Sequence, residues 1–209
     1  MLIPFLVYLI ASGKLAEFKA PGGIEAKFAR AAAESVSAAS QTVAYNDPQV
    51  VAKESVRSLI DRKILEIDES KPVIMTMSMG GGAQYYLPDV EQYLRVLSQF
   101  PNFKFVVLLD GNSQFVAYMP AWALRQMLPL QDLAQEFLNA VNSGNVPQVL
   151  RFPGVVKRTL STKSTNAEAL REMQEQNIEA LVVIDESRKL CGVVEREQVL
   201  SRMMLSLVR

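Results

Sequence analysis

The sequence predicts an α/β fold in which two copies of a helix–strand–strand–helix unit follow each other along the chain. Shifted by 75 residues without a gap, FVVLLDGNSQFVAYMPAWALRQML (105–128) overlies ALVVIDESRKLCGVVEREQVLSRM (180–203), which indicates a repeated structural unit. The short apolar runs VVLL and LVVI are bounded by polar turns and indicate buried strands. The spacing of Ala169, Leu170 and Met173 is typical of one helix face. Upstream, the match continues into the preceding helix at a shift of 76 residues.

Composition and charge fit a globular protein and exclude several functions. The 209 residues are 49% apolar, and 22 basic side chains balance 22 acidic ones, so the excess of basic charge typical of nucleic-acid binding is missing. The chain has no histidine, which excludes His-dependent triads and His-ligated metal sites. The single cysteine, Cys191, cannot form an internal disulfide and is interpreted as a small buried side chain of a strand. We therefore expect a cytoplasmic main body with no nucleic-acid partner.

Residues 1–13 contain an uncharged apolar run, LIPFLVYLIA. As a helix this run would extend about 15 Å, half the thickness of a bilayer's hydrocarbon core, so alone it cannot span a membrane. Three interpretations stay open: a short membrane-inserting anchor, a truncated span, or a buried core or oligomer-contact segment. The basic residues at positions 14, 19, 27 and 30 fit an anchor at the cytoplasmic face of the membrane.

The second segment, residues 14–46, is predicted to be a β-hairpin followed by a linker. KLAEFKAPGGIEAKF alternates around a Pro-Gly-Gly turn, and antiparallel pairing sets Glu17 opposite Lys27. Residues 31–42 are rich in Ala and Ser and are interpreted as a short helical or flexible linker.

Two further segments complete the predicted organisation. Residues 47–130 hold a leading helix, which begins at Asp47 and Pro48, and the first copy of the repeat. Residues 131–209 hold a connecting helix over 131–143, which Gly144 ends, and the second copy.

The second copy resembles a known family. STNAEALREMQEQNIEALVVIDESRKLCGVVEREQVLSRMM is similar to the cystathionine β-synthase-type (CBS) motif: a Thr-led helix, an apolar strand ending in Asp, a Gly-led strand and a closing helix. The first copy has the same order, and the likeness covers roughly residues 64–209. The resemblance implies tandem CBS motifs packed into one pair, a Bateman-type module. In that family such pairs commonly dimerise, bind adenosine-containing ligands between the motifs, and regulate or tether other proteins.

The family's ligand signature is altered in both copies. It consists of a Gly-led strand, a Ser or Thr, and three residues later an Asp that accepts hydrogen bonds from ribose hydroxyls. The second copy reads GVVEREQ, which puts Glu195 at the hydroxyl position and Gln198 at the ribose position. The first copy has Pro120 and Ala123 there, which offer no side-chain hydrogen bond. We expect the fold without most of the family's usual ligand contacts.

The candidate ligand cleft consists of Glu195, Gln198, Arg196 and Thr165. Gln198 can accept one ribose hydroxyl, whereas Glu195 adds negative charge near any phosphate. Arg196 either receives a phosphate or is a solvated basic residue at a strand end, and the second interpretation is favoured.

The function expected from the resemblance is non-catalytic and regulatory or scaffolding. The chain is expected to form a homodimer or higher oligomer, to contact a protein partner or a membrane surface, and to need no cofactor. A first alternative is a sensor of adenine nucleotides such as AMP, ATP or S-adenosylmethionine. A second is an enzyme that uses Asp68, Glu69 and Asp110, although these acids are more simply interpreted as turn residues.

Overall fold

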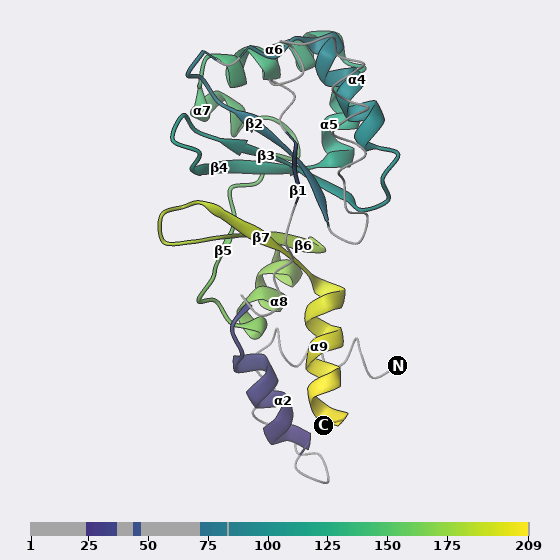
Figure 1. Cartoon of the computed structure of the whole chain (residues 1–209), viewed down its shortest axis with the longest axis vertical. Coiled ribbons are helices and arrows are strands. Elements are labelled where there is room, and N and C mark those ends of the chain that lie inside the picture. Colours follow the sequence, from purple (N-terminus) through teal and green to yellow (C-terminus); the bar gives the residue numbers. More distant parts are fainter. Residues whose placement is uncertain (1–23, 37–43, 47–71, 83, 209) are drawn as a thin grey trace. The chain divides into compact units, whose positions relative to one another are not determined.

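The computed structural model describes residues 24–36, 44–46, 72–82 and 84–208, which group into two compact units (Figure 1). The first-motif unit contains described residues 44–46, 72–82, 84–158 and 187–189. The second-motif unit contains described residues 24–36, 159–186 and 190–208. Each unit is a small mixed sheet with helices packed against it, which confirms the predicted α/β class.

The first-motif unit is built on a four-stranded sheet. Its strands are β1 (Ala44–Asn46), β2 (Val73–Ser78), β3 (Phe103–Leu109) and β4 (Phe115–Pro120). Its helices are α4 (Leu87–Leu97), α5 (Ala121–Met127), α6 (Gln131–Asn142) and α7 (Val146–Val149). The strands lie in the order β1-β2-β3-β4, with β1, β2 and β3 parallel and β4 antiparallel to β3. Helix α6 confirms the predicted helix over 131–143, and Gly144 follows it with φ +70°, as a helix-ending glycine should.

Continuous apolar runs explain why these strands are buried. The β2 sequence VIMTMS and the β3 sequence FKFVVLL match the pattern of parallel strands covered on both faces. One face of the sheet packs with the apolar stripes of the helices. Members of this core include Met75, Met77, Leu94, Leu97, Val106, Leu108, Met119, Leu124, Phe137 and Leu138.

The second-motif unit has a three-stranded sheet in the order β5-β6-β7. Its strands are β5 (Leu160–Ser161), β6 (Ala180–Ile184) and β7 (Leu190–Glu195). Its helices are α2 (Ile24–Ala33), α8 (Asn166–Glu175) and α9 (Arg196–Val208). Strand β5 is parallel to β6, and β7 is antiparallel to it. Its core includes Phe28, Ala31, Ala32, Val36, Leu170, Met173, Leu181, Val183, Val194, Val199 and Met203.

The predicted repeat holds at the level of strand register. Both units contain a parallel strand pair followed by an antiparallel hairpin, and both hairpins have an irregularity at the same place. The pairs around it are Leu108↔Ala117 and Leu109↔Phe115 in one unit, and Val183↔Gly192 and Ile184↔Leu190 in the other. Every partner differs by the 75-residue shift, so the two copies share one backbone plan.

The helix preceding each hairpin also repeats. The buried positions of α4 are Val90, Tyr93, Leu94 and Leu97, and those of α8 are Asn166, Ala169, Leu170 and Met173. The shift is the predicted 76 residues at every position. The same stripe of each helix therefore faces its sheet.

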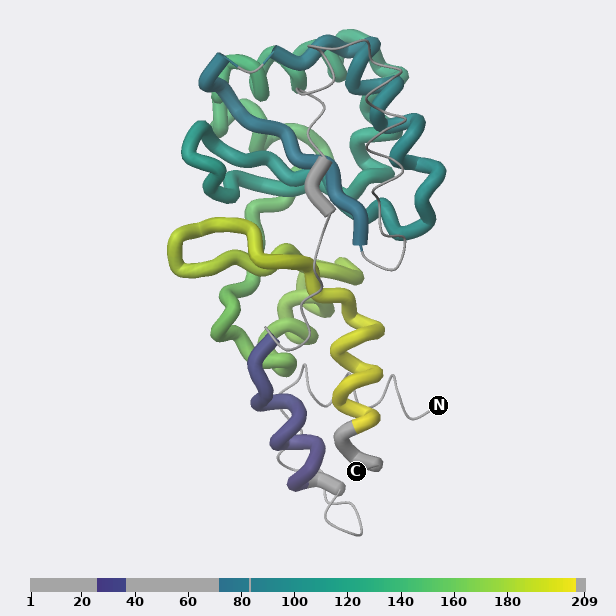
Figure 2. Tube along the Cα trace, viewed as in Figure 1, coloured from purple at the N-terminus to yellow at the C-terminus, as the bar shows by residue number. Residues whose placement is uncertain are grey.

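The described part of the predicted hairpin is wrong, because residues 24–33 form helix α2 and not a strand. Phe28, Ala31 and Ala32 are buried at helical spacing, whereas Lys27 and Arg30 are exposed. The Ala-rich sequence also has high intrinsic helix propensity. Helix α2 lies beside α9, and α8 also contacts it (Figure 2). Tertiary packing therefore stabilises a helix that the local sequence already favours.

Several predicted segments lie outside the described residues. They are the apolar segment 1–13, the first strand and turn of the hairpin, and the leading helix that begins at Asp47. Of the helices within residues 24–36 and 84–208, none is both long and apolar enough to cross a bilayer.

Candidate functional site

The four candidate site residues all belong to the second-motif unit, but they lie at opposite ends of strand β6. Glu195 ends β7 and pairs with Ala180, the first residue of β6. Thr165 begins α8 shortly after Ser161, which pairs with Ile184, the last residue of β6. Five strand residues extend roughly 15 Å. The structure therefore separates Thr165 from the other three candidates, which share the junction of β7 and α9.

Arg196 is bound to backbone carbonyls at the end of α8. Its Nη2 donates to Met173 O at 3.0 Å and to Ile178 O at 2.6 Å, while its backbone N–H donates to Glu179 O at 2.8 Å. The last carbonyls of a helix lack intrahelical donors and carry partial negative charge, so a guanidinium stabilises them. The favoured interpretation of Arg196 as a solvated residue is therefore wrong, because the side chain is half-buried and caps α8.

Thr165 also has a structural role. Its Oγ1 accepts a hydrogen bond from Glu168 N at 3.2 Å, and Glu168 Oε2 accepts one from Thr165 N at 2.8 Å. This reciprocal capping box satisfies two N–H groups that a helix start would otherwise leave without partners. The oxygen of the Thr165 hydroxyl thus stabilises the start of α8.

Gln198 has a buried acceptor, as Arg196 has a buried donor in its Nε, that forms no hydrogen bond with the residues described. It lies in the first turn of α9, and its Oε1 is buried without a hydrogen-bond partner among the residues that the structure describes. A buried carboxamide oxygen without a donor carries a desolvation penalty of about 1–3 kcal/mol. A hydroxyl or N–H donor that reached this atom would remove that penalty.

The corresponding position of the first copy is closed by packing. Ala123 is buried in α5, and the backbone of Gly154 lies against it. A Cβ added to Gly154 would be 2.7 Å from Ala123 Cβ, and Gly154 has φ +79°. The small residue and the close backbone fill the space that a ribose-binding side chain would need.

Asn166 is a polar residue that sequence reasoning missed. It is 3% exposed and occupies the core position that Val90 occupies in the first copy. Its Nδ2 donates to Ala31 O at 3.0 Å, and its backbone N–H donates to Glu34 O at 2.9 Å. Comparison of the two copies could have identified this residue, because Asn166 occupies a buried position where the other copy has Val90, and a buried Asn needs a hydrogen-bond partner.

The residues after α2 are joined to the loop that precedes α8. Ser35 Oγ donates to Thr162 O at 2.6 Å, Val36 N donates to Ser164 O at 2.7 Å, and Ser35 forms an antiparallel bridge with Thr165. These contacts connect residues more than a hundred positions apart in the chain. They make the N-terminal helix an integral part of the second motif.

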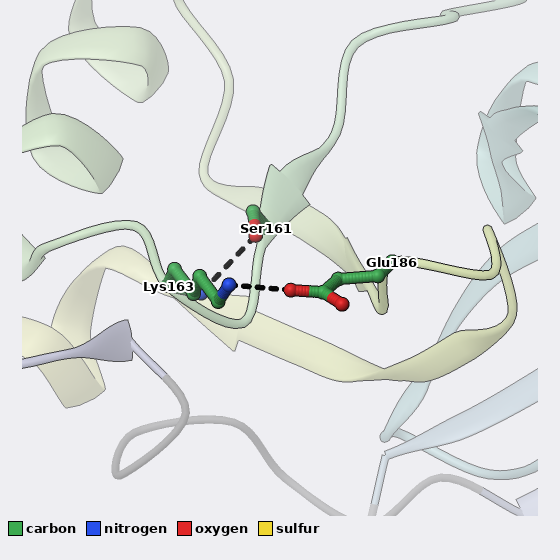
Figure 3. A network of polar contacts seen from close by, with 3 residues as sticks. All are labelled: Ser161, Lys163 and Glu186. Carbon is green, nitrogen blue, oxygen red and sulfur yellow. Dashed lines mark hydrogen bonds and ion pairs between the residues drawn. The ribbon is translucent and has the colours of Figure 1, made fainter.

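An exposed ion pair connects the same loop to the turn between β6 and β7. Figure 3 shows Lys163 donating from Nζ to Glu186 Oε1, while Lys163 N donates to Ser161 Oγ at 3.1 Å. Both charged side chains are largely exposed, so the pair contributes little to stability.

Cys191 is exposed, which corrects the prediction of a buried side chain. The register irregularity of the hairpin falls at Cys191, since Leu190 pairs with Ile184 and Gly192 pairs with Val183. Partial burial of the sulfur and then the carboxylate of Asp185 raise the pKa of the thiol. Cys191 is accessible, but it forms the reactive thiolate less readily than an ordinary cysteine.

Of the three acids in the enzyme alternative, the structure describes Asp110. Asp110 Oδ1 accepts hydrogen bonds from Asn112 N and Gln114 N, both at 2.8 Å, which is the role of a turn residue. Asp68 and Glu69 lie outside the described residues. Among the residues described, no three His, Cys, Asp or Glu side chains are grouped so that they could hold a metal ion.

Several solved structures are similar to this chain. They include the cytosolic domain of the Mg²⁺ channel MgtE in complex with ATP, at 15% identity and a TM-score of 0.39, over 60% of this chain and 44% of that one. The CBS domain pair of protein MJ0100 in complex with 5-methylthioadenosine and S-adenosyl-L-methionine aligns at 14% identity and a TM-score of 0.37, over 64% of this chain and 87% of that one. CBSX2 in complex with AMP aligns at 18% identity and a TM-score of 0.41, over 64% and 90%. This chain therefore spans less than half the length of the MgtE cytosolic domain.

A family model matches part of the chain. No curated protein matches the chain. The family model described as CBS domain matches residues 153–205, which include most of the described second-motif unit. The matched segment begins before β5 and includes α8, the β6–β7 hairpin and most of α9. Residues 153–205 are therefore a CBS domain.

Proposed function

We propose that the chain is a non-catalytic regulatory or scaffold protein whose two motifs act as a CBS pair. The shared register irregularity and the shared buried helix positions support treating the two units as copies of one motif. The observation that carries the proposal is that residues at the family's ligand positions have structural roles in this chain. Ala123 is packed against Gly154, Thr165 caps the start of α8, and Arg196 caps its end.

Thermal melting of the full chain with millimolar AMP, ADP, ATP and S-adenosylmethionine tests this proposal. A ligand at 100 times its dissociation constant stabilises a folded protein by about 2.7 kcal/mol, which is readily measured. We expect no saturable shift in melting temperature with any of the four. A saturable shift would contradict a purely scaffolding role.

An adenine-nucleotide sensor is the second candidate, and Gln198 is the observation that favours it. Its buried Oε1 without a partner among the described residues lies at the position that the family resemblance assigns to ribose. If a nucleotide binds there, Gln198→Met should abolish the thermal shift, because Met has a similar length but no carboxamide oxygen. Gln174→Met, on the exposed surface of α8, is the matched control and should leave the shift unchanged.

Self-association and attachment to the cytoplasmic face of a membrane through residues 1–13 are further parts of the proposal. Sedimentation equilibrium over a range of concentrations should give a mass of at least twice the 23.2 kDa of one chain. Fractionation of cells that produce the full chain or a variant without residues 1–13 tests the attachment. The full chain should sediment with membranes and the shortened variant should not, and equal distribution would rule the anchor out.

A further inference from the structure

A cleft in the first-motif unit is separate from all four candidate residues. It lies between α6 and the residues that surround α7, and its volume is about 390 Å³. Sites for small molecules typically measure about 300–1,000 Å³. Its walls are formed by residues between 133 and 153, which lie between the two copies of the repeat.

The apolar part of the cleft is built from rigid groups. Phe152 is largely buried, and Phe137 packs against it edge to face, with ring centroids 5.3 Å apart and an interplanar angle of 82°. Pro147, Pro153 and the half-buried Leu133 complete the apolar lining. Prolines and a fixed ring lose little conformational entropy when a ligand binds, which favours affinity.

The polar part of the cleft is held by a chain of side-chain hydrogen bonds. Asn145 Nδ2 donates to Gln148 Oε1 at 3.2 Å, and Gln148 Nε2 donates to Glu136 Oε1 at 3.2 Å. Asn145 Oδ1 in turn accepts from Gln148 N at 3.2 Å. These bonds fix the orientation of the Gln148 amide and engage one oxygen of Glu136.

Arg151 is the charged group of the cleft that lacks a partner. Its guanidinium lines the cleft, and it forms no hydrogen bond or ion pair with any residue the structure describes. A guanidinium presents donors in a planar fork that matches both oxygens of a carboxylate. A carboxylate on a ligand would pair with this guanidinium, whereas the carboxylate of Glu136, in the same lining, accepts a hydrogen bond from Gln148 instead.

We propose that this cleft binds a small amphipathic carboxylate. The apolar part of the ligand lies against Phe152, Pro147 and Leu133, and its carboxylate pairs with Arg151. Glu136 adds selectivity, because its carboxylate, which already accepts a bond from Gln148, repels a second negative group on the ligand.

Calorimetric titration of the full chain with phenylacetate and with its neutral analogue phenylacetamide tests the proposal. We expect phenylacetate to bind at least tenfold more tightly than the amide, since only the acid can pair with Arg151. The variant Arg151→Gln should remove that preference without changing the melting temperature. Arg125→Gln, an exposed arginine on α5, should retain it.

A second variant keeps the test independent of charge. Leu133→Trp fills the apolar part of the cleft while leaving Arg151 in place, and it should abolish binding of both compounds. The absence of saturable phenylacetate binding to the unmodified chain would overturn the proposal. So would an undiminished preference for phenylacetate in Arg151→Gln, or undiminished binding in a folded Leu133→Trp.

Discussion

Replacing Arg196 by alanine should destabilise the second-motif unit, because the substitution removes the cap at the end of α8. Two hydrogen bonds from a charged nitrogen, to Met173 O and Ile178 O, are lost together. A bond to a charged group contributes about 1.5–3 kcal/mol, and water replaces part of it at a half-buried site, so we expect a net loss of about 2–3 kcal/mol. A loss of 2 kcal/mol lowers the ratio of folded to unfolded protein by about 30-fold.

Urea unfolding and amide hydrogen exchange together measure this effect. Arg202→Ala, on the exposed surface of α9, which Arg196 begins, is the matched control and should change stability by less than about 0.5 kcal/mol. Exchange should accelerate at Gln176 and Ile178, whose N–H groups donate to carbonyls of the last turn of α8. The capping role would be refuted if Arg196→Ala were no more destabilising than Arg202→Ala, or if exchange at these amides were unchanged.

Two further predictions concern a close approach and a thiol. Gly154→Ala should lower the free energy of unfolding, measured in urea, by about 2–5 kcal/mol, because Gly154 has a left-handed φ and an added Cβ would clash with Ala123. Gly111→Ala is the control and should be near neutral, because an added Cβ there would meet nothing within 4 Å. Equal effects would refute the packing argument. Iodoacetamide should alkylate Cys191 more slowly than free cysteine at pH 7.5, because a raised pKa leaves less thiolate, and the rate should keep rising at higher pH. Asp185→Asn should speed the reaction at pH 7.5, and an unchanged rate would argue against the role of that carboxylate.

The repeat made the architecture predictable because periodic burial is encoded directly in sequence. Leu170 and Met173 face the core of one unit as Leu94 and Leu97 do in the other. The 75-residue shift extends to the strand pairs, since an antiparallel hairpin with a fixed loop length has a fixed register. Both copies could therefore be placed without any knowledge of their tertiary contacts.

The N-terminal helix could not be predicted in the same way. Antiparallel pairing would set Glu17 opposite Lys27, as a hairpin requires, but residues 24–33 also satisfy a helical pattern. What decides between the two is the surface of α8 and α9 on which Phe28 packs, more than a hundred residues later in the chain. Short apolar patterns are ambiguous until the partner surface is known.

The hydrogen bonds of the candidate site residues could not be predicted for a related reason, because a family position identifies a place in the chain but not what its side chain binds. Thr165 and Arg196 lie where a resemblance suggests ligand contacts, yet each satisfies backbone groups of α8. Helix ends leave backbone groups without intrahelical partners, and local geometry brings these two side chains within reach of such groups. Sequence reasoning placed the residues but not their hydrogen bonds.

The positions that the family resemblance assigns to a ligand have different structural roles in the two copies. In the first copy Ala123 is covered by the backbone of Gly154, so recovering a ligand contact there would require moving a packed chain segment. In the second copy Thr165 and Arg196 stabilise the two ends of α8, so using them for a ligand would cost helix stability. Gln198 has neither of these structural roles, and its buried oxygen has no donor among the described residues. Any response to a nucleotide should therefore depend on the junction of β7 and α9.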